Sequence, residues 1–466
     1  MRPGGDAHRT KPEYAGRPVS SELFLDSKRT GRIRNPITKK EGYRIMKRFA
    51  LMIVGVVFLF GLLTSMTFGA PREITFWLMP NAPDDLHTVW MDAKVAEFQK
   101  ETGITVHYEV IGWGDAWTRL VTAITGGEGA DVVQVGTTWN PQFAAMRGLA
   151  KVNPSGFGGI DAFMPANYES TTYKGESYGV PWFAETRCLF YNKDHFREVG
   201  FEPPTTYDEL VAVGNRLARV RGKGTAIAIA GNQAWDLLHN WAILLWAWGG
   251  DLTSPDLKKA TFNGPEGIEA MNWYVDLVRN GLASKSCAEY NQPDADAAFI
   301  NGNVSMAFMG PWNIANIQHD NPELNYGVVE PPKGPKARAA FSGGSNLAIL
   351  ASSRAEEDAK TWIKFLLRKD NLVSYTSELT YMLPATVEAF DDPAFATEMY
   401  KPFKAALEYA TAYPPLGVWG TMENDITVAF KAIFTDYVTG KLGADGVKKH
   451  LDDAARRVDA ALKTEK

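Results

Sequence analysis

The alternation of short apolar segments with helical segments after residue 71 most constrains what this chain can fold into. Arg72–Met79 (REITFWLM) combines β-branched and aromatic residues and predicts a strand, and the alternating Ile104–Ile111 (ITVHYEVI) predicts a second. Residues 88–102 between them carry apolar side chains at helical spacing. A helix near 116–124 and a nearly all-apolar strand at Asp131–Val135 follow. This order predicts an α/β fold with a parallel sheet.

The second half of the chain continues this rhythm less regularly. Its strand candidates are Cys188–Tyr191, Ala226–Ala230, Val304–Met309 and Asn346–Leu350. Its strong helix candidates are Tyr207–Val220, Pro265–Asn280, Ala355–Leu367 and Ile426–Thr439. No fixed-period repeat or low-complexity linker separates the parts, and 466 residues at about 100–200 residues per domain suggest two or three domains. We therefore expect two lobes that share several crossing segments.

A single long apolar run lies near the N-terminus. Residues 46–48 (MKR) form a basic start, Phe49–Leu63 forms an apolar core, and Gly69 and Ala70 end the segment with small side chains. This order is typical of a secretory signal peptide, so we expect residues 46–70 to be a signal that is cleaved near its end. The alternative is an uncleaved anchor, although the apolar core is short for a span of about 20 residues. Export predicts a periplasmic or otherwise extracytoplasmic protein.

Charge is distributed unevenly along the chain. Residues 1–45 carry 11 basic and 5 acidic side chains, and residues 46–70 add two basic ones. Because the whole chain has a formal charge of −5, residues 71–466 carry −13. This acidic body argues against nucleic acid as a partner, since nucleic-acid recognition needs a basic surface. The first 45 residues show no periodicity, and we interpret them as a misassigned or non-native extension, with a genuine basic extension as the alternative.

All 14 tryptophans lie between residues 77 and 419, which is an unusual density. Trp241, Trp246 and Trp248 fall within a very apolar run and are predicted to be core. Five others are candidates to line a ligand pocket, where flat aromatic rings combine with a few convergent polar groups: Trp113, Trp139, Trp235, Trp312 and Trp419. Cys188 and Cys287 are 99 residues apart, and in an exported chain they either pair or remain buried thiols.

Four parts of the sequence resemble one known family. They are Gly129–Leu149 (GADVVQVGTTWNPQFAAMRGL), Glu185–Asp194 (ETRCLFYNKD) with Pro203–Leu210 (PPTTYDEL), Gly302–Trp312 (GNVSMAFMGPW) and Gly343–Ile349 (GGSNLAI). With the signal segment, they make the chain similar to extracellular solute-binding proteins of family 1. These are the periplasmic sugar-binding proteins of ABC importers, related to maltose-binding protein. The resemblance spans about residues 73–460.

This resemblance implies a two-lobed periplasmic-binding-protein fold whose lobes close over ligand at a hinge of crossing segments. Lobe one would comprise residues 71–183 and 343–385, and lobe two residues 187–338 and 390–466. The implied function is the capture of a mono- or disaccharide and its delivery to the transmembrane subunits of an ABC permease. We expect a monomer with no enzymatic activity and no cofactor.

Several candidate ligand-binding residues follow the predicted strands of the first lobe. They are Asn81, Asp84 and Trp113 after the first two strands, and Thr137, Thr138 and Trp139 directly after the third. Ligands of open α/β sheets bind beyond the carboxyl ends of the strands. Members of the resembled family also place sugar-contacting residues on the turn after the third strand. The alternative for each residue is a purely structural role in its loop.

Other candidates rest on the resemblance. In the family, the position of Glu185 holds an acidic ligand-binding residue. Arg187 can donate a fork of hydrogen bonds, although maltose-binding protein has an apolar residue there. Trp312, followed by Asn313, matches the stacking tryptophan of the family's GPW motif. The alternatives are a hinge salt bridge between the first two residues and a core role for the tryptophan.

The last candidates lie in later segments of the chain. Trp235 and Asp236 precede the very apolar helix, just before which the family carries contacting residues. Ser345 follows two glycines after a crossing segment, where the backbone can approach a ligand. Trp419 precedes a helix expected to begin near Asp425, close to the family's late stacking aromatic residue.

Competing functions are less well supported by the sequence. No G-x-S-x-G, H-E-x-x-H, phosphate-loop or paired C-x-x-C motif occurs, and the seven histidines are not clustered, so neither a metal site nor a cofactor is expected. A secreted glycoside hydrolase remains a remote alternative, because no carboxylate pair has a recognisable spacing. A non-sugar solute such as a glycerol phosphate or a peptide is the nearer alternative. Arg187 is the only basic candidate, which favours a neutral sugar over a phosphate.

Overall fold

The computed structural model describes residues 72–232 and 235–465. The predicted signal segment, residues 46–70, and the preceding extension, residues 1–45, lie outside this part of the chain. No helix in the described part has the length and hydrophobicity needed to cross a membrane.

The first lobe is built on a six-stranded sheet. Its strands, in spatial order, are β13 (Leu383–Pro384), β6 (Val180–Glu185), β12 (Gly343–Ile349), β3 (Val132–Gly136), β1 (Arg72–Leu78) and β2 (Ile104–Val110). Strand β1 pairs in parallel with both β2 and β3, as the sequence predicts. The other pairings, of β12 with β3 and β6 and of β13 with β6, are antiparallel. The expectation of a parallel sheet is therefore confirmed only for the first three strands, because β12 returns from the second lobe in the opposite direction.

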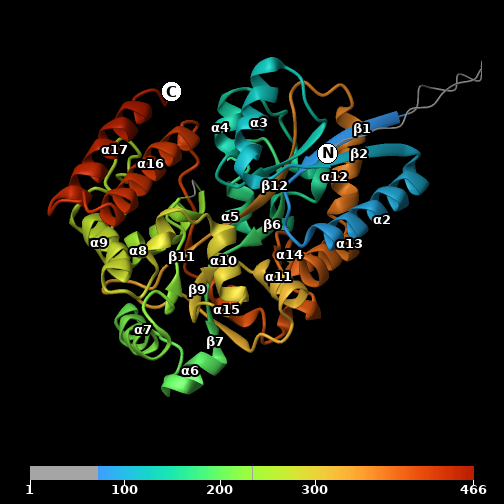
Figure 1. The fold of residues 1–466 in the computed structure, drawn as a ribbon. Coiled ribbons are helices and arrows are strands. Elements are labelled where there is room, and N and C mark those ends of the chain that lie inside the picture. The colour runs from blue at the N-terminus through green and yellow to red at the C-terminus, as the bar shows by residue number, and fades with distance from the viewer. Residues whose placement is uncertain (1–71, 233–234, 466) are drawn as a thin grey trace, which may run out of the picture. The chain divides into compact units, whose positions relative to one another are not determined.

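Helices cover both faces of this sheet (Figure 1). The main ones are α2 (Asp84–Thr102), α3 (Trp113–Gly126), α4 (Asn140–Ala145), α5 (Pro165–Glu169), α12 (Glu356–Leu366), α13 (Lys369–Val373) and α14 (Val387–Phe390). Successive side chains of a strand face opposite sides, so Val132 packs with α2 and α12 whereas Val133 packs with α3 and α4. Both faces of β3 are therefore buried, which explains its nearly uninterrupted apolar sequence.

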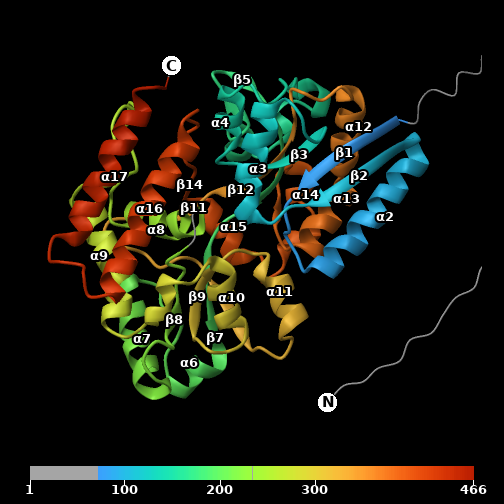
Figure 2. The same ribbon diagram turned by 45° about the horizontal axis from the view of Figure 1, so that its top comes forward.

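The second lobe is built on a four-stranded sheet. Its strands, in spatial order, are β10 (Tyr326–Val329), β7 (Cys188–Asn192), β9 (Met306–Met309) and β8 (Ile227–Ala228). Its helices are α6 (Lys193–Val199), α7 (Tyr207–Arg221), α8 (Trp235–Ala247), α9 (Pro265–Arg279), α10 (Gln292–Ile300), α11 (Asn313–Asp320), α15 (Lys401–Leu407), α16 (Trp419–Val438) and α17 (Gly446–Leu462). Figure 2 shows α16 and α17 beside α8 and α9, and these helices share one apolar core.

Tryptophans account for much of that core. Trp241, Trp246 and Trp248 are 0–9 % exposed and belong to it, which confirms their predicted core role. Cys188 and Cys287 are both buried free thiols.

The chain crosses between the two sheets at several points. Strand β6 of the first sheet runs directly into β7 of the second through Thr186 and Arg187. A second crossing leads from β10 to β12, and on the way β11 (Ala340–Phe341) pairs with β14 (Ala410–Thr411). These crossings bring residues from both lobes to the same place, so side chains on them can contact a ligand held between the lobes.

Candidate ligand-binding site

The carboxyl ends of β1, β2 and β3 meet at one edge of the first sheet, because these strands are parallel. The segments that follow them carry Asn81, Trp113 at the start of α3, and Thr137–Trp139. A cavity of about 530 Å³, the main pocket, lies against these segments and is closed on its other side by residues of α8, α10 and α11. Its volume is within the range of about 300–1,000 Å³ found for small-molecule sites.

Most of the predicted site residues line the main pocket. They are Asn81, Trp113, Thr137, Thr138, Trp139, Glu185, Arg187, Trp235, Asp236, Trp312 and Ser345. The structure therefore brings together residues that are more than 260 positions apart in the sequence. Their contact with a ligand stays a prediction.

Three predicted residues do not line this pocket. Asp84 is exposed in the first turn of α2. Asn313 is fully buried and donates from Nδ2 to Asp296 Oδ2 at 2.9 Å, so it positions the carboxyl group of Asp296, which lines the pocket. Trp419 is fully buried and stacks on Tyr413 with 4.4 Å between ring centres. The predicted helix start near Asp425 was wrong, because α16 begins at Trp419 and places this ring in the core.

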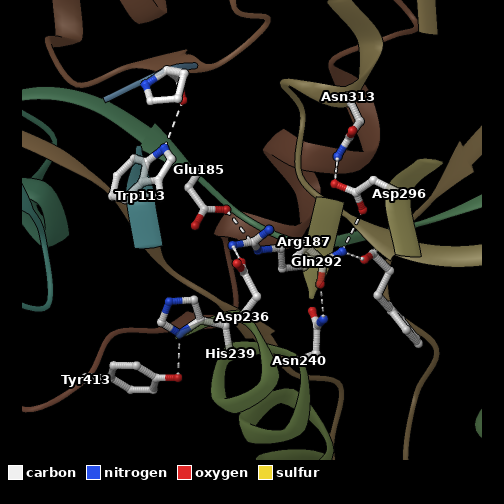
Figure 3. A network of polar contacts seen from close by, with 12 residues as sticks. Trp113, Glu185, Arg187, Asp236, His239, Asn240, Gln292, Asp296, Asn313 and Tyr413 are labelled. Atoms are coloured by element: carbon white, nitrogen blue, oxygen red, sulfur yellow. Dashed lines mark hydrogen bonds and ion pairs between the residues drawn. The ribbon is translucent and has the colours of Figure 1, made fainter. Parts of the chain in front are cut away.

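Arg187 is the centre of a polar network in the pocket wall (Figure 3). Its side chain is almost completely buried, and its Nη2 donates to Asp236 Oδ1 at 2.6 Å. Its Nε lies 3.4 Å from Glu185 Oε2, so the hinge salt bridge that stood as the alternative to ligand binding for these two residues is present. The guanidinium carbon lies 4.4 Å from the ring centre of Trp312, a cation–π contact. Arg187, which lies where the chain crosses between the sheets, thus contacts side chains of β6, α8 and the segment before α11.

The buried carboxyl groups of this network have raised pKa values. Burial raises the pKa of Glu185 to about 7, against the lowering effect of Arg187. Burial likewise raises the pKa of Asp296 to about 7, although hydrogen bonds from Asn313 and Gln292 favour its charged form. Removing a carboxylate from water disfavours its charge, and one guanidinium does not compensate for several carboxylates. Both carboxyl groups therefore keep their protons to a higher pH than exposed carboxyl groups do.

His239 lines the pocket but was missed by the sequence analysis. Its ring stacks on Phe341 with 4.2 Å between centres and 11° between planes, and its Nδ1 lies 2.9 Å from the hydroxyl of Tyr413. Burial lowers the pKa of His239 well below its usual value, so the imidazole is neutral. A signal was available in the sequence, because His239 follows Trp235 by four residues and shares its helix face.

Gln292 and Asp296 were also missed, and both line the pocket from α10. Gln292 Nε2 donates to Asp296 Oδ1 at 2.6 Å, and Asn240 Nδ2 donates to Gln292 Oε1 at 3.0 Å. Two polar residues at i and i+4 occupy the same face of a helix. This spacing shows that the two side chains share a helix face, but Asp294 in the same segment is polar as well, so the spacing does not identify the face that lines the pocket.

Tryptophans from both lobes form an edge-to-face series along the pocket. The ring centres of Trp113 and Trp139 are 5.8 Å apart, and those of Trp139 and Trp235 are 5.2 Å apart, with planes inclined at 64° in both pairs. Trp113 is held in place by a hydrogen bond from Nε1 to the carbonyl oxygen of Pro80 at 2.9 Å. Edge-to-face packing fixes the rings, and Trp139 in the middle of the series is only 2 % exposed.

The start of β12 approaches the pocket closely with its backbone. Gly344 has a φ of +134°, and a Cβ atom there would lie 2.1 Å from the carbonyl oxygen of Phe183. Only glycine is compatible with this conformation and contact. The next residue, Ser345, accepts a hydrogen bond at Oγ from Gln134 Nε2 at 2.9 Å. The close approach of the backbone therefore requires a glycine at position 344, where the crossing segment enters β12.

Among the described residues, no three His, Cys, Asp or Glu side chains are grouped so that they could hold a metal ion. The side chains that line the main pocket can form hydrogen bonds, ion pairs and aromatic contacts.

Residues 93–402 match the family described as bacterial extracellular solute-binding protein. The diacetylchitobiose-binding protein DasA of Streptomyces coelicolor is 27 % identical over 390 residues, which cover 82 % of this chain and 88 % of that protein. A maltotriose-binding protein of Pyrococcus abyssi is 24 % identical over 328 residues, covering 68 % of this chain and 69 % of that protein. Both relatives are named for the oligosaccharide that they bind.

Solved structures show the same two-lobed fold. An ABC transporter solute-binding protein of Thermotoga lettingae, bound with α-D-tagatose, superimposes with a TM-score of 0.76 at 25 % identity, covering 84 % of this chain and all of the other. The GacH receptor of Streptomyces glaucescens, solved unliganded and with acarbose, has a TM-score of 0.73 at 24 % identity, covering 85 % of this chain and all of the other. The match of well over half of the chain to one family model settles its membership. The chain belongs to the bacterial extracellular solute-binding protein family, with relatives that are sugar-binding proteins of ABC transporters.

Proposed function

We propose that this protein captures a mono- or disaccharide between its two lobes outside the cytoplasm and delivers it to the transmembrane subunits of an ABC permease. The observation that carries the proposal is the main pocket, whose walls combine tryptophans of both lobes with a small set of buried polar groups. Sugars present hydroxyl groups together with apolar C–H faces, and such a wall matches both.

The charge of the pocket supports a neutral ligand. Arg187 is the one Lys or Arg side chain among the described lining residues, and its Nη2 already donates to Asp236. His239 is neutral, because burial lowers its pKa. A phosphate ligand would face Glu185, Asp236 and Asp296 with no free cation to compensate. Carboxylates instead suit sugar hydroxyls, each of which can donate a hydrogen bond.

The arrangement also supports a binding protein rather than a hydrolase. Glycoside hydrolysis commonly uses two carboxyl groups with separate roles on either side of the scissile bond. Here Glu185 and Asp236 contact the same guanidinium, that of Arg187. We therefore propose that bound sugar is released unchanged, which chromatography of sugar incubated with the protein would verify.

We propose that residues 71–183 with 343–385 and residues 187–338 with 390–466 move as two bodies about the crossing segments. A ligand in the main pocket would contact Trp139 on one body and Trp235 on the other. Because such a ligand interacts better with the closed arrangement than with the open one, it shifts the population toward closure. The closed form would then be the one that the permease recognises.

Calorimetric titration of the purified protein tests the proposal. The panel would contain glucose, N-acetylglucosamine, maltose, maltotriose and diacetylchitobiose, with glycerol 3-phosphate and a tripeptide as the competing ligand classes. We expect saturable binding of at least one sugar and no binding of the phosphate or the peptide. Binding of the phosphate or the peptide alone, with no response to any sugar, would contradict a sugar-binding function.

A further inference from the structure

The first turn of α16, a helix of the second lobe, packs against α4 of the first lobe. The side chain of Val418, the residue before α16, does not cap the helix, so its first backbone N–H groups need acceptors from elsewhere. Gln142 on α4 supplies one, since its Oε1 accepts a hydrogen bond from the backbone N–H of Gly420 at 2.7 Å. A helix of one lobe is thus capped by a side chain of the other, and separation of the lobes would break this bond.

Glu423 lies one turn further along α16 and is completely buried. Neither of its carboxyl oxygens forms a hydrogen bond with a described residue. Trp139, which precedes α4, and Trp419, which begins α16, both act on this carboxyl group, so it lies where the two lobes meet. Their effect favours the charged form, but burial outweighs it and raises the pKa of Glu423 well above its usual value. An ionised carboxylate without partners would be costly here, and the group is therefore protonated.

The described groups around Glu423 offer no cation to compensate its charge. Asp236 on α8 acts on it and raises its pKa further, because two carboxylates repel each other. Tyr413, in the segment before α16, is neutral, since burial raises the pKa of its hydroxyl well above its usual value. α4 carries no titratable residue, and among the described residues no charged group of α17 or of residues 285–288 changes the pKa of Glu423. Glu423 can therefore carry a charge only where water reaches it.

Separation of the lobes would bring water to Glu423, because Trp139 belongs to one of the two proposed moving bodies and α16 to the other. In water the carboxyl group of Glu has a pKa of 4.5 and is ionised at neutral pH. Trp139 also lines the main pocket, whereas Glu423 does not. Closure around a ligand therefore buries this carboxyl group without a contact between the two, and the group must bind a proton as it is buried.

We propose that closure of the lobes over sugar buries Glu423 beside Trp139 and Trp419 in its protonated form, so that sugar binding takes up one proton from solvent at a residue that does not touch the sugar. This inference rests on the proposed sugar-binding function. The closed arrangement binds the proton more tightly than the open one, so acid favours closure. Affinity for sugar then falls as pH rises above the ordinary range of a carboxyl group, by up to about tenfold per pH unit.

The experiment measures the number of protons taken up when sugar binds. Each sugar of the calorimetric panel that binds would be titrated at about pH 7 in phosphate, HEPES and Tris buffers, whose different enthalpies of ionisation reveal proton uptake. Glu423→Gln keeps the shape of the side chain but cannot ionise. Asp425→Asn on the same helix is the matched control, because its carboxylate is partly exposed and accepts from Arg457 Nε at 2.8 Å.

We expect the unmodified protein to take up about one proton more per bound sugar than Glu423→Gln. The fall of affinity between about pH 5.5 and 7.5 should be smaller in Glu423→Gln by up to about tenfold per pH unit. Glu185 and Asp296 are present in both proteins, so the difference between them reports on Glu423. At about pH 7.5 Glu423→Gln should bind sugar at least about tenfold more tightly than the unmodified protein, since its closure requires no proton. Asp425→Asn should match the unmodified protein.

Equal proton uptake by the unmodified protein and Glu423→Gln, or weaker sugar binding by Glu423→Gln at about pH 7.5, would overturn the inference. Glu423→Met, which is also uncharged, is measured beside it, and circular dichroism identifies which variant is folded. If sugar binds without this proton uptake, the proposed function stands and only the inference fails. If no sugar binds the unmodified protein, the proposed function itself fails and the inference fails with it.

Discussion

In the main pocket the charged side chains already contact one another. In a second pocket, a cavity of about 340 Å³ lined by α5 and residues 410–415, the side chains of Asn167 and Thr137 form no hydrogen bond with another described residue. Arg187, Asp236 and Glu185 form one buried group, and Asp296 is held by Asn313 and Gln292. Asn167 and Thr137 have no such neighbours. The first arrangement fixes side chains before a ligand arrives and contributes to folding. The second contributes little to folding.

The largest expected effect comes from removing the cation of the main pocket. Arg187→Met would leave Glu185 and Asp236 buried without their shared partner, and loss of one member of a buried ion pair costs about 3–5 kcal/mol. Urea denaturation should show a loss of unfolding free energy of this size. The exposed pair of Arg197 with Asp194 is the control, since Arg197→Met should cost less than about 1 kcal/mol. Similar losses in both variants would show that the pocket network is not specially stabilised.

The second expected effect is a dependence of stability on pH. The carboxyl group of Glu185 has an ordinary pKa of 4.5 and a folded pKa of about 7, and that of Asp296 rises from 3.8 to about 7. Between these values the folded state holds protons that the unfolded state has lost, so stability falls as pH rises and levels off above about pH 7. Each group contributes roughly 3–4 kcal/mol to this fall at about 1.36 kcal/mol per pKa unit.

Unfolding of the unliganded protein between pH 4.5 and 8 would measure this dependence. The variant Glu185→Gln should flatten the fall, because its amide cannot titrate, and Asp296→Asn should do the same. Glu169→Gln, which replaces an exposed carboxylate outside the network around Arg187, is the control. A fall of the same steepness in all three variants would contradict the proposed origin of the pH dependence.

The third prediction concerns ligand affinity. Trp312→Ala should weaken binding of the preferred sugar by about 2 kcal/mol, or roughly 30-fold, because aromatic anchors dominate binding free energy and this ring also contacts Arg187. Circular dichroism should show a folded variant. Trp90→Ala removes a half-buried tryptophan that lines neither pocket and should bind sugar normally if it folds. Unchanged affinity of Trp312→Ala would remove this residue from the site.

Much of the fold and of the main pocket could be predicted from the sequence. The alternating apolar segments gave β1, β2 and β3 nearly to the residue, since local periodicity determines them. The loops after these strands were predictable because parallel strands end at one edge. Segments that resemble the family supplied Glu185 and Trp312, which no local pattern identifies.

What could not be predicted depends on packing between distant segments. Trp419 was expected to lie on a loop, but Tyr413 and the core of α16 bury its ring. Gln292 and Asp296 face the pocket only because α10 packs beside β9, and helical spacing does not reveal which face a neighbour covers. The second pocket is formed by α5 and residues 410–415, which are about 240 positions apart, and no spacing in the sequence links Asn167 on α5 to Thr138 after β3.

The smallest expected effect separates the two pockets most directly. Asn313 and Asn167 are both buried asparagines, but Asn313 donates to Asp296 whereas the side chain of Asn167 has no partner among the described residues. Asn313→Leu should therefore lower the free energy of unfolding by about 1–3 kcal/mol, because it leaves a buried carboxyl oxygen unpaired. Asn167→Leu should change it by less than about 0.5 kcal/mol, since no hydrogen bond is lost. Equal losses of unfolding free energy for the two variants in urea denaturation would contradict this difference. They would show that the Asn167 amide has a structural partner in solution.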